Sequence, residues 1–301
     1  MMPSGAPFLV TGATGNVGRH VLAALRARGA PVRVALHHPD RCAAAADGTE
    51  AVHLDFRDPA TYGKALAGVR GVFLMRPNPV LDVRRTLNRF LDAAASRNVA
   101  HVVFLSVAGA EHNSFVPHHK VEQHLMRGGM RWTMLRPGFF AQNLTGPYRR
   151  DITAGVLTLP AAGARVAYVD AADLGELAAL ALSRPEAHGG KGYHLTGPDS
   201  LTFAEVAQLL SLELGRTVRY RAVSPWRYWM HCREQGVGAG PALAYTLIHV
   251  TLRNGSGATT SPLLAQLLGR PARTMREFIA AHRGAWAETS ASPQSLSQAM
   301  R

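Results

Sequence analysis

The stretch Val10-Thr11-Gly12-Ala13-Thr14-Gly15-Asn16-Val17-Gly18 is the most informative part of this chain. It follows the apolar run Phe8–Val10 and precedes apolar residues at helical spacing, namely Val21, Leu22 and Leu25. A strand that ends in a glycine turn before a helix presents backbone N–H groups to an anion, as dinucleotide pyrophosphates require. The spacing is GxxGxxG rather than GxGxxG, and glycines also mark ordinary turns, so the strand–helix context is the stronger indication. The stretch predicts a nucleotide cofactor site formed by Gly12, Thr14, Gly15, Asn16 and Val17.

Length and composition indicate a soluble globular protein. The 301 residues are 47% hydrophobic, which is enough for a large core in one elaborated domain or two. No apolar run is long enough to span a bilayer, and the first residues, MMPSGAPFLVTG, do not form a signal peptide. The two cysteines, Cys42 and Cys232, fit no paired-ligand spacing. We therefore expect a cytoplasmic protein with no metal site and no membrane partner.

The net charge of +13 raises the question of nucleic-acid binding. Arginines are scattered through the whole chain and form no run of five or six basic residues, and lysine occurs only at Lys64, Lys120 and Lys191. This distribution argues against a specific nucleic-acid surface, although a general attraction for anionic ligands remains open.

Strand-like and helical patterns alternate through the first half of the chain. Short apolar runs, bounded by glycine, proline or polar residues, indicate buried parallel strands at Phe8–Val10, Val32–Leu36, Ala51–Leu54, Val72–Met75, Val102–Leu105 and Trp132–Leu135. Helical patterns lie between them at about residues 16–29, 59–67, 80–97 and 117–127. This alternation predicts a doubly wound α/β fold of the Rossmann type, with its ligand at the carboxyl ends of the strands.

The second half is less regular and predicts a smaller, mainly helical lobe. Asp170 is placed to cap a helix that runs to about Ser183, with Asp173 in its first turn. Further strands are predicted at 192–196 and 218–223, and helices at 202–214 and from 225 onward, where several aromatic residues lie close together. The glycine-rich stretches 236–240 and 254–257 are candidate hinges or lid loops. We expect a cofactor domain over residues 1–150, to which about 165–197 return, a substrate lobe over 198–286, and a disordered tail over 287–301.

The end of the second predicted strand bears on the choice of dinucleotide. NAD sites usually carry an acid there that binds the ribose hydroxyls, whereas this chain has His37 and, further on, Arg41. We therefore expect NADP(H) to be preferred over NAD(H), the alternative being that His37 is only an exposed loop residue. Asp55 and Phe56 follow the third strand and are predicted to meet the adenine, although Asp55 is nearly as well explained as a turn residue.

A set of motifs in fixed order resembles the NmrA-like family, a branch of the atypical short-chain dehydrogenase/reductases. The matching segments are TGATGNVG, LDFRDP, FLSVAGA, PHHKVEQHL, WTMLRPGFFAQNL, YVDAADLGELA, GGKGYHLTGPDSLTFAEVA and LLGRPARTMREFIAAHRGAW. The resemblance implies an NAD(P)-binding Rossmann domain with a C-terminal lobe that closes the cleft. It also implies either an NADPH-dependent quinone, azo-dye or phenylpropanoid reductase, or a redox-sensing regulator that binds the cofactor without turnover.

The catalytic residues implied by this resemblance are incomplete. Dehydrogenases with a Tyr-x-x-x-Lys pair need the tyrosine one helical turn before the lysine, and Val116 stands there instead. Lys120 matches the lysine of the branch, which holds the nicotinamide ribose and in some of these reductases also acts as a catalytic acid/base; the alternative is a chance surface lysine. We consider His118 a candidate proton donor, because an ordinary imidazole titrates near neutral pH, with a solvated or capping role as the alternative. Ser106 is expected to contact cofactor or substrate.

Further candidates follow from position alone. Met75, Pro137 and Phe139 lie at or just beyond predicted strand ends and are expected beside the cofactor. Aromatic residues that suit a planar substrate are Phe140, Trp226, Tyr228 and Trp229. The same aromatic residues also fit a role in domain packing.

The leading hypothesis is an NADPH-dependent reductase that passes hydride to a small planar electrophile such as a quinone or a conjugated enone. The main alternative is an NAD(P)-sensing regulatory protein without turnover. A third is an isomerase or epimerase that retains its cofactor. We expect a small-molecule substrate and a monomer or homodimer.

Overall fold

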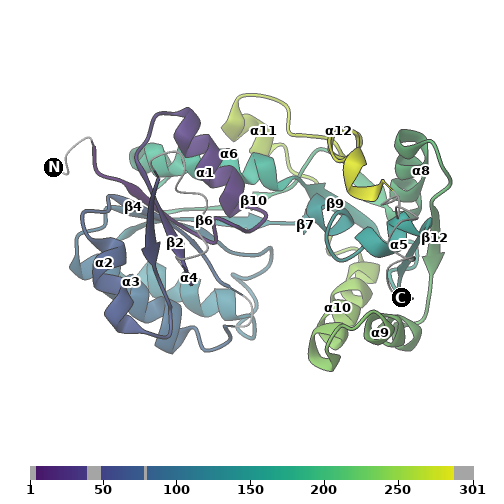
Figure 1. Ribbon diagram of the computed structural model, residues 1–301, viewed down its shortest axis with the longest axis horizontal. Helices are drawn as coiled ribbons and strands as arrows, with labels where there is room; N and C mark the ends of the chain where they lie inside the picture. The colour runs from purple at the N-terminus through teal and green to yellow at the C-terminus, as the bar shows by residue number, and fades with distance from the viewer. Residues whose placement is uncertain (1–4, 39–48, 78–79, 288–301) are drawn as a thin grey trace, which may run out of the picture. The chain divides into compact units, whose positions relative to one another are not determined.

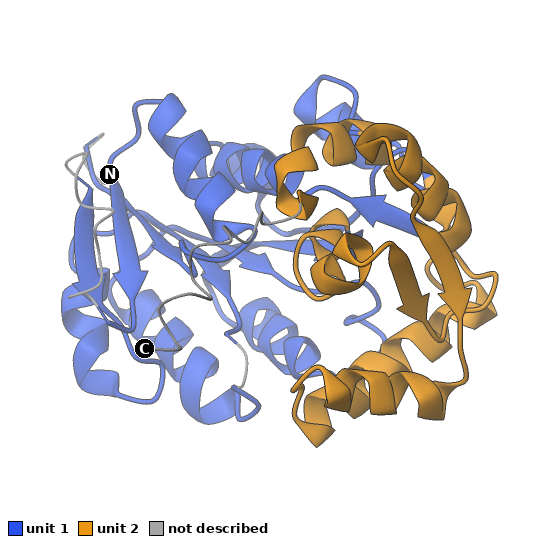
Figure 2. Ribbon diagram, turned by 45° about the vertical axis from the view of Figure 1, so that its right-hand side comes forward, with its two compact units in different colours: residues 1–140, 167–199, 260–273 blue, residues 141–166, 200–259, 274–301 orange. Residues whose placement is uncertain are grey.

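The computed structural model describes residues 5–38, 49–77 and 80–287. The chain divides into two compact units, shown in different colours in Figure 2. Unit 1 comprises residues 1–140, 167–199 and 260–273, and unit 2 comprises residues 141–166, 200–259 and 274–301. The predicted tail, 287–301, lies outside the described residues except for its first position, and so does Arg41.

Unit 1 is built on a seven-stranded sheet with the order β10-β6-β5-β4-β1-β2-β3. All its recorded pairings are parallel. The strands are β1 (Phe8–Thr11), β2 (Val32–Leu36), β3 (Glu50–His53), β4 (Gly71–Met75), β5 (His101–Leu105), β6 (Arg131–Pro137) and β10 (Lys191–Leu195). A short further strand, β7 (Phe139–Phe140), pairs in parallel with β9 (Arg165–Val169).

Helices cover both faces of this sheet (Figure 1). One face carries α1 (Gly18–Ala27), α6 (Ala171–Ser183) and α11 (Leu263–Leu268), and the other carries α2 (Tyr62–Leu66), α3 (Arg89–Ser96) and α4 (Pro117–Arg127). A π-helical turn (Arg84–Asn88) precedes α3, and α7 (Pro185–His188) follows α6. This is the doubly wound Rossmann-like α/β fold that the sequence predicts.

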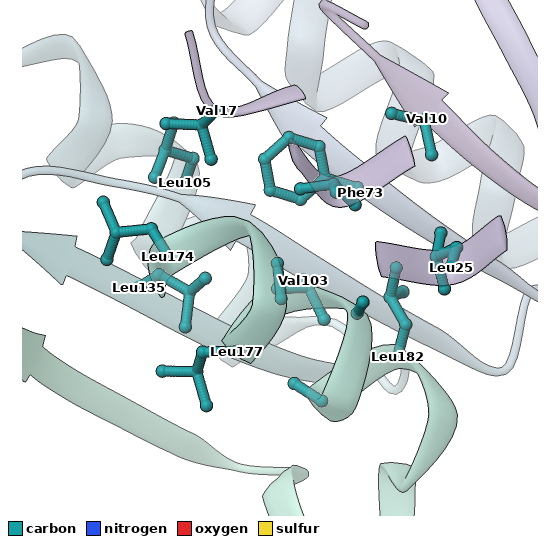
Figure 3. Packing of buried hydrophobic residues seen from close by; sticks show 14 of the residues in the cluster. Val10, Val17, Leu25, Phe73, Val103, Leu105, Leu135, Leu174, Leu177 and Leu182 are labelled. Atoms are coloured by element: carbon teal, nitrogen blue, oxygen red, sulfur yellow. The ribbon is translucent and has the colours of Figure 1, made fainter. Parts of the chain in front are cut away.

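The strand sequences explain why both faces are covered. In β5, Val103 and Leu105 join the cluster beneath α1 and α6, while Val102 and Phe104 join the cluster beneath α3 and α4. Successive strand residues point to opposite faces, so a continuous apolar run requires helices on both sides. Figure 3 shows the first cluster, in which Phe73 of β4 lies among side chains of β5, β6, α1 and α6.

Unit 2 is smaller and mainly helical. Its helices are α5 (Arg149–Thr153), α8 (Phe203–Leu214), α9 (Pro225–Glu234), α10 (Ala239–Thr251) and α12 (Met275–Ala281). A parallel pair is formed by β8 (Val156–Leu159) and β12 (Arg219–Ala222), and β11 (Ser200–Thr202) precedes α8. Thr202 and Thr274 each form a capping box, with Glu205 and Glu277 respectively, which explains where α8 and α12 begin.

Several elements differ from the sequence-based expectation. The predicted loop at 236–240 is shorter, because α10 already begins at Ala239, and the first helix begins at Gly18 rather than residue 16. Four short strands, β7, β8, β9 and β11, had no predicted counterpart. Asp170 caps α6 as predicted, accepting a hydrogen bond from the Ala172 N–H at 2.8 Å.

Residues 260–273, which the sequence assigned to the substrate lobe, cluster with unit 1. The buried carboxylate of Asp173 explains this placement. It accepts hydrogen bonds from Arg270 Nη2 at 2.7 Å, from the backbone N–H of Arg273 at 2.7 Å, and from the Arg273 guanidinium. The polar contacts fasten the segment to α6. In the described part of the chain no helix has the length and apolar character needed to cross a membrane.

Candidate functional site

The glycine turn between β1 and α1 is packed too tightly for side chains. Gly12 has a φ of +63°, and its carbonyl oxygen accepts a hydrogen bond from Gly15 N–H at 2.9 Å. A Cβ atom on Gly18 would lie 2.1 Å from the Gly12 oxygen. No side-chain hydrogen bond caps the start of α1. These are the features that let a backbone approach and bind a pyrophosphate.

Thr11 ties this turn to the neighbouring strand β4. Its hydroxyl donates to the Phe73 carbonyl at 3.0 Å and accepts from the Met75 N–H at 3.0 Å. Met75 is thereby held over Gly12, where a Cβ atom would lie 2.0 Å from the Met75 sulfur. Gly12 is therefore required both by its backbone conformation and by the side chain above it. Thr11 was not predicted as a site residue, although it stands directly before the first glycine.

A pocket of about 370 Å³ lies beside this turn at the carboxyl ends of β1–β4. It brings together six predicted cofactor residues: Gly12, Thr14, His37, Asp55, Phe56 and Met75. The other lining residues are Thr11, Ala35, Leu36, Leu54, Arg57, Pro77 and Val80. Its mainly apolar walls next to a phosphate-binding turn suit the adenosine part of a dinucleotide.

Polar side chains gather at one end of the pocket. His37 Nδ1 lies 3.9 Å from Asp55 Oδ2, while Asp55 Oδ1 accepts a hydrogen bond from the Arg57 N–H at 2.8 Å. The turn role of Asp55 is therefore observed, and the residue also lines the pocket, whereas its contact with the adenine remains a prediction. Among the described residues no group of three or more His, Cys, Asp or Glu side chains is arranged to hold a metal ion.

The predicted catalytic residues lie on α4, which Pro117 starts. Lys120 is exposed. Burial and, to a smaller extent, the positive charge of Arg76 together lower the pKa of His118 to about 4. The ring of His118 lies 6.0 Å from that of Phe104, and its Nδ1 is buried without a hydrogen-bond partner. At neutral pH His118 is uncharged, so the expectation of an ordinary imidazole pKa was wrong: the ring carries no surplus proton.

Ser106 is already engaged with another side chain. Its buried hydroxyl donates to Glu122 Oε1 at 2.5 Å, and Arg136 binds both oxygens of Glu122, at 3.0 and 2.8 Å. Arg136 also lies 3.4 Å from Glu111, whose other oxygen is 2.6 Å from His194. Because its hydrogen is already donated to Glu122, Ser106 can make the expected contact with cofactor or substrate only by accepting a hydrogen bond. Sequence reasoning missed this network, since its members come from separate elements.

The model of the NmrA-like family matches residues 7–230, most of the chain. The chain belongs to the NmrA-like family. It is 31% identical over 284 residues to the NAD(P)H azoreductase of Xenophilus azovorans, covering 93% of this chain and 99% of that enzyme. It is 33% identical over 296 residues to a (4-alkanoyl-5-oxo-2,5-dihydrofuran-3-yl)methyl phosphate reductase of Streptomyces griseus, with the same coverage.

The structure of an Escherichia coli NADPH-dependent quinone oxidoreductase, complexed with NADPH, is also similar. It superposes with a TM-score of 0.82 at 25% identity and covers 91% of this chain and 99% of that one. Together with the two reductases, it identifies this NmrA-like protein as an oxidoreductase.

Residues after β6 contribute to packing in this NmrA-like protein. Pro137 is buried at the end of β6, and the half-buried ring of Phe139 meets Tyr168 edge to face at 5.7 Å. Phe140 packs against the core cluster beneath α1 and α6. None of the three lines the pocket beside the glycine turn. The packing alternative for the two phenylalanines is therefore observed, and their contact with cofactor or substrate remains a prediction.

The aromatic residues of α9 in this NmrA-like protein differ in exposure. Trp226 is 69% exposed and stacks on Trp229 with ring centroids 5.1 Å apart. Tyr228 is only 4% exposed, and its ring lies edge to face with His249 at 5.3 Å inside unit 2. The two tryptophans can offer a ring to a planar ligand, whereas Tyr228 belongs to the interior of unit 2.

Proposed function

We propose that this NmrA-like protein is an NADPH-dependent reductase that delivers hydride to a small planar electrophile, a quinone or a conjugated enone. The observation that carries the proposal is the glycine turn at Gly12 and Gly18 with the adenosine pocket beside it. A Cβ atom at either glycine would collide with the protein's own atoms, so the tight strand–turn–helix geometry typical of dinucleotide-binding turns depends on these glycines. The names of the related azo, quinone and dihydrofuranone phosphate reductases support an electrophile of this kind.

The protein's part in the reaction is to bind and orient. Backbone N–H groups at the start of α1, with Gly15, Asn16 and Val17, hold the pyrophosphate, and Phe56 and Met75 flank the adenine. NADPH supplies the hydride when bound. Lys120 holds the nicotinamide ribose, His118 contacts the nicotinamide end as a neutral ring, and Ser106 accepts a hydrogen bond there.

We propose that the residues that follow β2 favour NADP(H) over NAD(H). His37 lines the pocket where an NAD-specific site would carry an acid, and Arg41 follows a few residues later. Substrate contacts are assigned to Trp226, Trp229 and Phe140. We further propose a small-molecule substrate, a monomer or homodimer, a cytoplasmic location and no nucleic-acid partner.

An NAD(P)-sensing regulator without turnover is the second candidate. Two observations favour it: Val116 stands where a tyrosine acid would be, and the Ser106 hydrogen is committed to Glu122. A sensor needs the cofactor pocket and no proton donor.

The deciding experiment is NADPH consumption by the purified protein with a panel of quinones, enones and azo dyes. Lys120→Ala should reduce turnover. The control is Lys64→Ala, which changes an exposed lysine on α2 and should leave turnover unchanged. Turnover that falls only in Lys120→Ala supports the reductase and the role of Lys120. Tight NADPH binding without consumption of any acceptor supports the sensor.

A further inference from the structure

A second cavity in unit 1, of about 510 Å³, lies at the opposite end of the strands from the glycine turn. Its walls come from the ends of α1 and α6, which lie on the same face of the sheet, and from the residues just before β2 and β4. The glycine turn follows the carboxyl end of β1, whereas these segments lie at the amino-terminal ends of the strands. Strands of four or five residues separate the two ends by about 15 Å, so this cavity is not part of the pocket beside the glycine turn.

The cavity carries positive charge only. Arg28 follows α1, Arg70 precedes β4, and Arg184 follows α6. The other lining residues are Gly29, Ala30, Pro31, Leu180 and Ser183, none of which is charged. Within residues 5–38, 49–77 and 80–287, no acidic side chain forms an ion pair with any of these three arginines, in contrast to Arg33, which pairs with Glu50 at 2.8 Å.

Arg70 is half-buried, whereas Arg28 and Arg184 are exposed. The guanidinium carbon of Arg70 lies 3.9 Å from the centroid of the Phe8 ring, and its Nε is buried without a hydrogen-bond acceptor. Burial lowers the pKa of Arg70. Removing a cation from water without giving it an acidic partner disfavours the folded state, and an anion in the cavity would offset that cost.

The helix ends explain only part of this cluster. Cations at a helix C-terminus compensate the negative end of the helix dipole, and Arg28 donates from Nη1 to the Ala24 carbonyl at 3.0 Å. Arg97 makes the same contact at the end of α3, to the Ala93 carbonyl at 3.2 Å, but does not line this cavity. Arg70 precedes a strand, so compensation of a helix dipole does not account for it.

We propose that this cavity binds a small oligophosphate, of which pyrophosphate is the simplest example. Guanidinium groups bind phosphate oxygens through paired N–H donors. A single phosphate monoester carries a charge of about −1.5 to −2 and offsets at most two of the arginines, whereas two linked phosphate groups match all three. The volume is in the range of small-molecule sites. The inference is independent of the proposed function, because none of the three arginines lines the pocket beside the glycine turn.

The test is calorimetric titration of pyrophosphate into the full-length protein at low ionic strength, with saturating NADPH present to occupy the glycine turn. We expect binding that weakens as salt is added. Arg28→Gln and Arg184→Gln, both at exposed positions, should each weaken the affinity about tenfold, because each removes charge-assisted hydrogen bonds. Arg97→Gln is the matched control, since it removes an arginine from a helix end outside the cavity, and it should bind as the wild type does.

A further variant, Arg70→Met, separates ligand binding from packing. Methionine keeps an unbranched side chain next to Phe8 and removes the charge, so the melting temperature without ligand should change little. Pyrophosphate should raise the melting temperature of the wild type, because it binds only the folded protein, and this rise should be lost in Arg70→Met.

Several results would overturn the proposal. Absence of pyrophosphate binding, or equal decreases in affinity for Arg28→Gln and Arg97→Gln, would remove the cavity as its site. Binding that occurs only without NADPH would place pyrophosphate at the glycine turn instead. Tighter binding of citrate or of a single-stranded oligonucleotide would make the cavity a carboxylate site or a nucleic-acid contact. If NADPH itself does not bind, the proposed function fails, while the arginine variants still test this cavity.

Discussion

The hydroxyl of Ser106 and the carboxylate of Glu122 form a hydrogen bond of 2.5 Å inside unit 1. Glu122 is fully buried and is neutralised by the guanidinium of Arg136, which binds both its oxygens. Because the serine hydrogen points to Glu122, Ser106 cannot polarise a substrate carbonyl by donation. The end of β5 thus has a different chemical role from the serine of a tyrosine-dependent carbonyl reductase.

Removal of Glu122 should destabilise the protein strongly. Glu122→Leu leaves the largely buried Arg136 without its carboxylate, which we expect to cost about 3–5 kcal/mol in the free energy of unfolding. The double variant Glu122→Leu with Arg136→Met should recover part of this loss. Glu186→Gln, which breaks an exposed pair with Arg131, should cost less than about 1 kcal/mol. The free energies of unfolding are measured in urea. Equal decreases for Glu122→Leu and Glu186→Gln would contradict the stabilising role of the buried pair.

Gly18→Ala should abolish nucleotide binding. The added Cβ would overlap the Gly12 carbonyl, so the turn must open and its N–H groups must move. Gly129→Ala is the matched control, because a Cβ there meets nothing within 4 Å. Calorimetric titration with NADPH should show at least about a 100-fold weaker affinity for Gly18→Ala only, equivalent to about 3 kcal/mol. Unchanged binding would show that the turn does not hold the pyrophosphate.

Acid should destabilise unit 1 through His101. Burial lowers the pKa of His101 to about 4, helped by the charges of His188 and Arg131. The unfolded chain takes up a proton at an ordinary pKa of about 6.5, whereas the folded chain does not until about pH 4. The stabilisation present above pH 6.5 is therefore lost between pH 6.5 and 4, by up to about 3 kcal/mol.

The measurement is the free energy of unfolding against pH for the wild type and His101→Leu. Thr133 donates its hydroxyl to the His188 carbonyl at 2.8 Å, so His101 Nε2 is the donor to Thr133 at 2.9 Å. The leucine variant loses this bond but should show a flatter profile between pH 6.5 and 4. A profile parallel to the wild type would assign the acid sensitivity to other groups.

Replacement of Asp173 should weaken the attachment of residues 260–273 to α6. Asp173→Ala leaves two arginines and a backbone N–H without their common acceptor, which we expect to cost about 2–4 kcal/mol. Hydrogen exchange in α11 should accelerate. Glu176→Ala removes only the more exposed partner of Arg270 and should have a smaller effect on the same amides. Unchanged exchange in Asp173→Ala would contradict the fastening role.

Substitution of Trp226 should affect substrate binding, whereas substitution of Tyr228 should affect stability. Trp226→Ala, at an exposed position, should change the free energy of unfolding by less than about 0.5 kcal/mol and raise the KM for a quinone. Tyr228→Ala, at a buried position, should cost about 3–5 kcal/mol. A quinone KM unaffected by Trp226→Ala would place the substrate elsewhere.

Local patterns in the sequence were enough to predict the strands and helices of the first half. The runs at β1, β4 and β5 are continuous and apolar because both faces of the sheet are covered, and Pro117 and Asp170 mark helix starts through their own backbone chemistry. The short strands β7, β8 and β9 were missed because two to five residues carry too little periodicity to be distinguished from loops.

By itself the sequence determined the fold class and the glycine turn between β1 and α1, because both depend on residues close together in the chain. Only the tertiary structure decided that Ser106 faces Glu122, that His118 is a half-buried ring with a lowered pKa, and that His53 lies beside His37. The physical reason is that hydrogen bonding, desolvation and charge proximity depend on partners that come from other elements, and no local pattern encodes their positions.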